Sequence, residues 1–216
     1  AKGDDVTIVP GVNEEIYVPD NHHLISCASC TTNCVAQVVK IINDYLTIQA
    51  GTFCTIHAYS NDQSILDQPH PDLRRGRAFS FNTILTTTGA ANAVGRVIPE
   101  VKGKLHAIAY RVPVHCGSLV DCTFITENKT TKDEVNNLFI KASEGINKGF
   151  IGYSDAPLVS IDFKADPRSA VVDGISTAIL GGNIVRIVAW YDNEWSYSMR
   201  VCDLIAYATG IGYRRY

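Results

Sequence analysis

The chain has 216 residues, 46% of them hydrophobic, and a formal net charge of −3. This length suits one large domain or a small pair, and the apolar content allows a sizeable core. The small negative charge gives no reason to expect binding to nucleic acid or to a membrane surface. No apolar run approaches the roughly 18 residues that a membrane span needs.

The seven cysteines are an odd number at irregular spacing, which indicates free thiols in a reducing compartment. The first residues also lack the apolar stretch of a secretory signal peptide. We therefore expect a cytoplasmic protein, with a plastid as the other reducing location.

Two short strands are predicted near the N-terminus, at residues 6–9 and 24–26. The second leads into a cluster of three cysteines, Cys27, Cys30 and Cys34. Apolar residues at helical spacing follow and predict a helix over residues 31–46. A cysteine at the start of a helix lies where unpaired N–H groups and the helix dipole favour an anion, and this makes the thiol a better nucleophile.

A strand is predicted over residues 51–58, with His57 close to its end. Residues 60–87 form a long stretch of little periodicity that contains several arginines. These arginines could be a solvated run of charge, or they could form an anion site or ion pairs across a subunit interface. Thr88 and Gly89 then begin a helix that ends before Pro99. Backbone N–H groups at such a start can hold a phosphate, although threonine is also an ordinary N-cap.

The second half of the chain is rich in predicted strands, at residues 105–112, 118–126, 158–163, 170–172, 175–180 and 184–190. A capping box at Thr131 and Glu134 begins a helix that ends near Gly145, and a last helix covers residues 194–208. Strands outnumber helices, and long strands follow one another without helical crossovers. The pattern favours an α+β fold, with a mixed, mainly antiparallel sheet and helices on one face.

Three interpretations of the cysteine cluster are open on these grounds. The three thiols and His57 could bind zinc, but structural zinc sites usually pair two short-spaced motifs, and His57 has no neighbouring ligand. Cys27 and Cys30 have the CxxC spacing of a redox pair, but no thioredoxin-like βαβ pattern surrounds them. The third interpretation is covalent catalysis by one cysteine with His57 as its base, which needs no metal.

The segment ASCTTNC at residues 28–34 resembles the active-site signature of the phosphorylating glyceraldehyde-3-phosphate dehydrogenase family. Other segments resemble that family in the same order, across essentially the whole chain: TIHAYS at 55–60, DLRRGR at 72–77, TGAA at 88–91, RVP at 111–113 and WYDNE at 190–194. The resemblance implies the fold of the family's C-terminal catalytic domain at residues 30–193, with a long loop at 60–87. Residues 1–29 would be a remnant of the nucleotide-binding domain, and residues 194–216 a C-terminal helix that returns to it.

The resemblance also implies roles for individual residues. Cys30 would be the nucleophile that forms a thioester, and His57 the general base, whose imidazolium would stabilise the thiolate. One phosphate site would be built by Ser29, Thr31, Thr88 and Gly89. The other would be built by Ser60, Asp62 and Arg111, together with Arg75. The nicotinamide of NAD or NADP, with NAD favoured, would contact Asn193 and Tyr197.

The implied activity is that of an oxidoreductase in glycolysis, which oxidises glyceraldehyde 3-phosphate with inorganic phosphate and is a homotetramer as a full enzyme. Two alternatives are an erythrose-4-phosphate dehydrogenase and a truncated, non-catalytic domain that self-associates. We expect a fragment, and negligible dehydrogenase activity for this chain alone. Cys27 stands where the family usually has asparagine, and we hypothesise that it forms a disulfide with Cys30 on oxidation.

Overall fold

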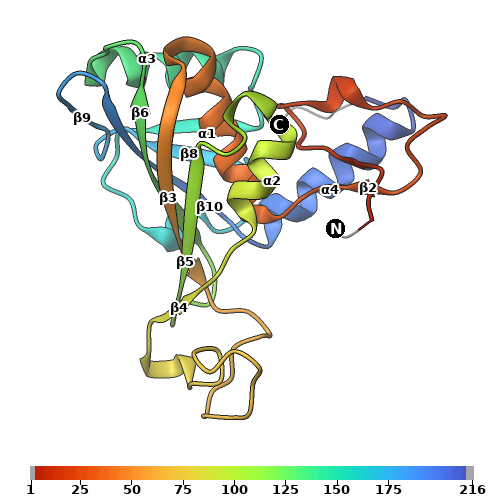
Figure 1. Ribbon diagram of the computed structural model, residues 1–216, viewed down its shortest axis with the longest axis vertical. Coiled ribbons are helices and arrows are strands. Elements are labelled where there is room, and N and C mark those ends of the chain that lie inside the picture. Colours follow the sequence, from red (N-terminus) through yellow and green to blue (C-terminus); the bar gives the residue numbers. More distant parts are fainter. Residues whose placement is uncertain (1–2, 213–216) are drawn as a thin grey trace.

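The computed structural model describes residues 3–212 (Figure 1). The expected N-terminal remnant and C-terminal segment therefore include residues 1–2 and 213–216, which lie outside the described residues. The helices are α1 (Cys30–Leu46), α2 (Ala90–Val97), α3 (Lys132–Glu144) and α4 (Trp195–Ala208). The strands are β1 (Val6–Thr7), β2 (Ile25–Ser26), β3 (Ile48–Ala58), β4 (Ile84–Thr86), β5 (Leu105–Val112), β6 (Ser118–Thr126), β7 (Ile151–Ser154), β8 (Ala170–Asp173), β9 (Ala178–Leu180) and β10 (Ile184–Tyr191).

The main sheet has the strand order β4-β5-β3-β6-β10-β8-β7, with β9 paired to β10. The pairs β3–β5 and β7–β8 are parallel, and the other pairs in this sheet are antiparallel. Helices α1, α2 and α3 pack together on one face of the sheet (Figure 1). The prediction of a mixed, mainly antiparallel sheet with helices on one face is confirmed.

One parallel pair departs from the expected absence of crossovers and positions the site. The chain leaves β3, passes through the long loop, β4 and α2, and returns as β5 beside β3. Parallel pairing requires such a crossover, whereas a hairpin would make the pair antiparallel. As a result, His57 near the end of β3 lies opposite Arg111 near the end of β5.

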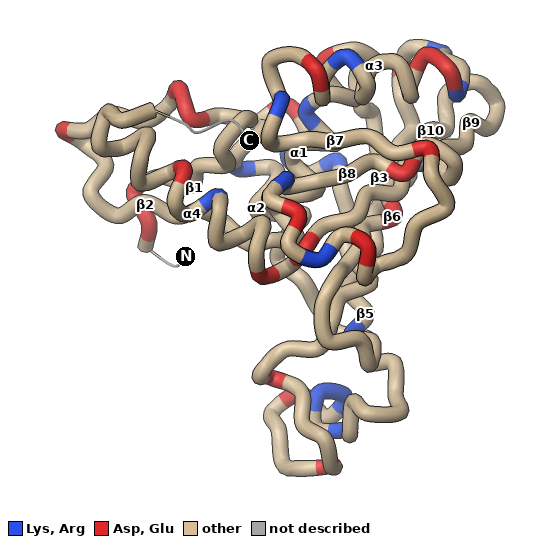
Figure 2. Tube along the Cα trace, turned by 180° about the vertical axis from the view of Figure 1, so that it is seen from behind, with Lys and Arg blue, Asp and Glu red and all other residues tan. Residues whose placement is uncertain are grey.

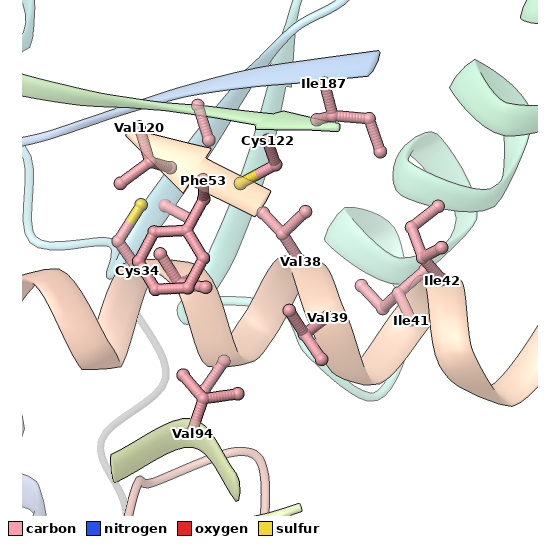
Figure 3. Close-up of a cluster of buried hydrophobic side chains, with 14 of the residues drawn as sticks. Cys34, Val38, Val39, Ile41, Ile42, Phe53, Val94, Val120, Cys122 and Ile187 are labelled. Atoms are coloured by element: carbon pink, nitrogen blue, oxygen red, sulfur yellow. The ribbon is translucent and has the colours of Figure 1, made fainter. Parts of the chain in front are cut away.

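The core lies between α1 and the sheet. Val38 and Ile42 on α1 are fully buried, as are Val120 and Ile187 on the facing strands (Figure 3). These α1 residues recur at a four-residue spacing, which places them on one side of a helix. The predicted helix of residues 31–46 and its buried side are confirmed, and this packing fixes α1 across the strands.

In the region before β10, one predicted strand was wrong and another was predicted too long. Residues 158–163 contain a short 3-10 helix, η4 (Ser160–Phe163), which begins where the backbone N–H of Val159 donates to Asp162 Oδ2 at 2.8 Å. This side-chain bond competes with strand pairing. Of residues 175–180, strand β9 takes up Ala178–Leu180, because the chain turns at Gly174 after β8. Strand β7 was missed, since it is short and contains a glycine. Strand β4 was also missed: the predicted loop of residues 60–87 is too long, because residues 84–86 pair with β5.

A second, smaller cluster lies away from the main core. Strands β1 and β2 form a parallel pair, and Val6, Ile8, Cys27 and Leu204 pack together between this pair and α4. Helix α4 is tied to the main body by Arg200, which forms a buried ion pair with Asp203 at 2.7 Å and donates to the Gly149 carbonyl at 3.2 Å. None of the described helices has both the length and the apolar character needed to cross a membrane.

The loop of residues 60–83 projects from one end of the sheet in both views (Figures 1 and 2). Oppositely charged residues pair within it, including Arg75 with Asp62 at 2.9 Å and Arg77 with Asp67 at 3.1 Å. Four of its large apolar side chains are exposed: Ile65, Leu66, Leu73 and Phe81. Polar bonds rather than a hydrophobic core therefore hold this loop, in keeping with its lack of periodicity.

Candidate active site

Cys30 is the first residue of α1, and the turn before it is held by side chains. Ser29 is the N-cap and accepts a hydrogen bond from the Thr32 N–H at 3.1 Å. Ala28 has a positive φ of 57°, a conformation that costs a non-glycine residue roughly 1 kcal/mol. The Asn33 side chain offsets this cost by donating to the carbonyls of Cys27 and Ser29 at 2.8 and 2.9 Å.

This turn brings Cys30 to His57. The Cys30 Sγ lies 3.4 Å from His57 Nε2, and the other ring nitrogen, Nδ1, lies 2.7 Å from the Ala58 carbonyl oxygen. Arg111 Nη1 approaches the same two atoms, at 2.6 Å from Nδ1 and 2.9 Å from the carbonyl. Because arginine can only donate, the Nη1–Nδ1 contact is a hydrogen bond only when Nδ1 is unprotonated. In the other neutral tautomer Nδ1 donates to the Ala58 carbonyl, which also accepts from Arg111, and Nε2 offers a lone pair to the thiol. In that tautomer His57 is placed to act as a general base.

The pKa values of both members of this pair are shifted by their surroundings. Burial raises the pKa of the Cys30 thiol, although the Thr31 backbone N–H acts in the opposite direction. Burial, with the nearby Arg111 charge, lowers the pKa of His57 to about 4. The thiol therefore holds its proton more strongly than the imidazole does, because neither charge is well solvated. Burial thus disfavours both charges of the expected thiolate–imidazolium pair, and that pair stays a prediction.

The pair opens into a pocket of about 380 Å³. Its lining includes five of the residues predicted to bind phosphate: Ser29, Thr31, Thr88, Gly89 and Arg111. The sequence assigned Arg111 and the other four to separate phosphate sites, and the structure brings all five to one pocket. Arg111 Nε is buried without a hydrogen-bond partner among the described residues. An unpaired guanidinium donor beside a pocket suits an anionic ligand.

Three further residues predicted to bind phosphate lie in the projecting loop, outside the lining of this pocket. Arg75 is linked to the pocket through Thr86, a lining residue whose Oγ1 accepts from Arg75 Nε at 2.6 Å. Asp62 is linked through its ion pair with Arg75. The Ser60 hydroxyl instead donates to Gln63 Oε1 within the loop at 3.1 Å. Asp62 and Arg75 thus form a pair that reaches the pocket lining through Thr86. Ser60 is connected to this pair through Gln63, whose Nε2 donates to Asp62 Oδ2 at 3.4 Å.

The residues predicted to contact a nicotinamide, Asn193 and Tyr197, are each bonded to a segment beside the catalytic pair. Asn193 Oδ1 accepts from Ser118 Oγ at 3.0 Å, and Ser118 Oγ itself accepts from the N–H of Ala58, the residue after His57. The Tyr197 hydroxyl donates to the Ala28 carbonyl at 3.5 Å. The Asn193 amide is held by its oxygen, which leaves its N–H donors to face away from Ser118.

The other two cysteines of the cluster have different surroundings from Cys30. Cys27 lies in the second cluster under α4, and burial raises its pKa to about 12. Cys34 is fully buried in the main core near Cys122 and Phe53 (Figure 3), and burial raises its pKa well above the usual value. Among the described residues, no three histidine, cysteine, aspartate or glutamate side chains converge in a way that could hold a metal ion.

Sequence reasoning missed Tyr191 and Thr55. The Tyr191 hydroxyl lies 2.9 Å from both Thr31 Oγ1 and Thr55 Oγ1, and the Tyr191 ring meets the His57 ring edge-on at 6.1 Å. Thr55 lines the pocket. Both residues lie in segments that the sequence analysis singled out, TIHAYS at 55–60 and WYDNE at 190–194, but within a strand they look like ordinary core positions and were given no role.

A larger hollow of about 620 Å³ lies between α1 and α3. It is lined by the outer side of α1, by α3 and by residues 11–15, and the described residues place no cysteine or histidine in it. Lys40 and Asp44 on its α1 side form an ion pair with each other at 2.6 Å. The pocket at Cys30 is therefore the better candidate for chemistry, although it is the smaller of the two.

Comparison with known proteins gives a consistent family. Residues 29–193 match the family model described as glyceraldehyde 3-phosphate dehydrogenase, C-terminal domain. The chain is 50% identical over 212 residues to glyceraldehyde-3-phosphate dehydrogenase 1 of Bacillus cereus, covering 98% of this chain and 64% of that protein. It is 50% identical over 204 residues to glyceraldehyde-3-phosphate dehydrogenase 2 of Bacillus subtilis, covering 94% and 60%. For the Geobacillus stearothermophilus enzyme the identity is 49% over 212 residues, covering 98% and 63%. The chain thus spans somewhat under two thirds of the length of these relatives.

Proposed function

The chain belongs to the glyceraldehyde 3-phosphate dehydrogenase family, and on this basis we propose that it is the catalytic part of an enzyme that oxidises glyceraldehyde 3-phosphate with phosphate and NAD(P). The observation that carries the proposal is the contact of Cys30 Sγ with His57 Nε2 at 3.4 Å, at the N-terminus of α1 and on a pocket that contains Arg111.

Cys30 and His57 supply the covalent chemistry of this proposal. The Cys30 sulfur adds to the aldehyde carbon, and the thiol proton passes to His57 Nε2 and then to the former carbonyl oxygen. The product is a thiohemiacetal on Cys30, in which a C–S bond has replaced the π bond of the aldehyde. His57 Nε2 then accepts the hydroxyl proton as the carbon is oxidised, and a thioester on Cys30 results. A base with a pKa below 7 is neutral and ready to accept a proton at physiological pH.

The chain's own residues would hold the nicotinamide on the side of Asn193 and Tyr197. The N–H donors of the oriented Asn193 amide suit the carboxamide oxygen of that ring, and the Tyr197 ring offers an aromatic surface near Cys30. A bound nicotinamide would supply the acceptor for the hydride of the thiohemiacetal.

The phosphate groups would bind at the pocket's positive and N–H-rich walls. Arg111 brings its positive charge to the pocket, and Gly89 in the pocket lining is the N-cap of α2, where the start of a helix favours an anion. Ser29 and Thr31 complete this wall at the start of α1, where the hydroxyl group of Thr31 is hydrogen-bonded to Tyr191. Phosphate held there would attack the Cys30 thioester, and the C–S bond would break to give an acyl phosphate and the free thiol.

Protection of Cys30 from alkylation tests this proposal without the coenzyme. Glyceraldehyde 3-phosphate is added to the chain, and labelling of Cys30 by iodoacetamide is followed by mass spectrometry. We expect slower labelling of Cys30, with unphosphorylated glyceraldehyde protecting much less, and we expect Arg111→Gln to remove the difference between the two aldehydes. Equal protection by both aldehydes in the parent chain, or no protection by either, would contradict the proposed function.

A further inference from the structure

Tyr191 is completely buried at the end of β10, and its hydroxyl group meets two other elements. One contact is Thr31 Oγ1 on α1 and the other is Thr55 Oγ1 on β3, each at 2.9 Å. Thr31 directly follows Cys30. Thr55 lies two residues before His57 and so faces the same side of the strand. The Tyr191 hydroxyl thus joins the helix that carries the thiol to the strand that carries the base.

The protons of this cluster have a definite order. Thr55 Oγ1 donates its proton to the Leu119 carbonyl at 3.2 Å, so it must accept from Tyr191. Tyr191 has one proton to give, and therefore accepts from Thr31. Burial raises the pKa of Tyr191 well above its usual value, which keeps this hydroxyl protonated. Each of the three hydroxyls is buried, and each would lose a partner if its neighbour were removed.

We propose that Tyr191 is a positioning residue, whose hydroxyl group holds Cys30 against His57 by bridging Thr31 and Thr55. The inference rests on the proposed role of Cys30 as nucleophile. The Sγ–Nε2 distance of 3.4 Å is set by how α1 lies on β3, and the bridge is a polar link between these two elements beside the reacting atoms. A misplacement of about 1 Å between reacting groups can cost on the order of a hundredfold in rate.

The test is a double-mutant cycle on the full chain, read out as the alkylation rate of Cys30 by iodoacetamide at pH 7. Tryptic peptide 3–40 holds Cys27, Cys30 and Cys34, and fragment ions within it assign the label to Cys30. We expect Tyr191→Phe to slow labelling roughly tenfold. In the His57→Asn background the same change is expected to have almost no effect, since there is no base left to position. Equal slowing in both backgrounds, or no slowing in either, would overturn the proposal.

If Tyr191→Phe does not fold, two matched substitutions of Thr55, at the other end of the bridge, decide whether the bridge positions Cys30. Thr55→Val keeps the side-chain shape and removes the hydroxyl, whereas Thr55→Ser keeps the hydroxyl and removes a methyl group. We expect valine to slow Cys30 labelling and serine to restore most of the lost rate; the reverse order would show a packing role and refute positioning. These labelling rates are measured without glyceraldehyde 3-phosphate. Failure of the bridge would therefore appear in the rates of the variants, whereas failure of the proposed function would appear as lack of protection by that aldehyde.

Discussion

Cys27 and Cys30 are three residues apart in the sequence, yet their thiols lie in different regions with different chemistry. Cys30 lies at the start of α1, on a polar pocket and within contact of His57. Cys27 packs among Val6, Ile8 and Leu204 under α4, where burial raises its pKa to about 12. The difference arises from the intervening turn, in which Ala28 adopts a positive φ and Ser29 caps the helix. The reactivity of a thiol here depends on the region it faces rather than on its place in a cysteine motif.

Removal of each thiol in turn gives the largest expected contrast between the two regions. The chain is incubated with acetyl phosphate, and thioester formation is read from the intact mass. Cys30→Ala is expected to abolish acylation, because Cys30 alone among the described cysteines contacts a histidine. The Cys116 thiol donates to the Asp192 carboxylate at 3.4 Å, but burial and that negative charge raise its pKa to about 11. Cys27→Ala is the matched control and is expected to keep most of the acylation. Persistent acylation of Cys30→Ala would show that a different thiol carries the chemistry.

The pocket also makes the free energy of unfolding depend on pH, because it contains the buried His57. The second cluster does not contain this residue and lacks the contribution. The folded pKa of His57, about 4, is below the ordinary value of 6.5, so the unfolded chain binds this proton first as the pH falls. The associated stability is fully present above pH 6.5 and is lost as the pH falls to 4. We expect a loss on the order of 3 kcal/mol in the free energy of unfolding. Urea unfolding at several pH values should show this slope for the parent chain and a smaller one for His57→Gln. Equal slopes for the two proteins would contradict the buried neutral imidazole.

Treatment with mild peroxide is expected to give the smallest difference between the two thiols. It tests the hypothesis that Cys27 and Cys30 form a disulfide. The two thiols face different regions, and the raised pKa of Cys27 leaves very little thiolate to form the bond. We therefore expect Cys27 to remain a free thiol after treatment. Loss of both thiols together, with a mass decrease of about 2 Da in peptide 3–40 from the two hydrogens lost on pairing, would restore the original hypothesis.

Features set by local sequence were well predicted. Residues 31–46 and 105–112 have clear periodicity, and the capping box of Thr131 and Glu134 is present at the start of α3 as expected. The predicted strand at residues 158–163 failed because a single carboxylate, Asp162, turns the chain into a 3-10 helix. The spacing of apolar residues along the chain cannot reveal such a side-chain hydrogen bond.

The candidate site was predicted less completely, since long-range contacts create it. Cys30 and His57 stood out through their motifs, and the structure brings them together. Tyr191 lies 160 positions from Thr31 and 136 from Thr55, so its bridge exists only in the folded chain. The pKa shifts of Cys30 and His57 likewise could not be read from the sequence, because they depend on burial and on Arg111, which reaches His57 through the parallel β3–β5 pair.

The central claim is that the environment of Cys30, and His57 in particular, makes it the reactive thiol of the cluster. The most direct measurement compares iodoacetamide labelling of Cys30 and Cys27 within peptide 3–40 at pH 7, in the parent chain and in His57→Asn. We expect Cys30 to be labelled at least about tenfold faster than Cys27, and we expect the His57 substitution to remove most of that advantage. If Cys27 is labelled as fast as Cys30, or if Cys30 keeps its full rate without His57, the account is wrong.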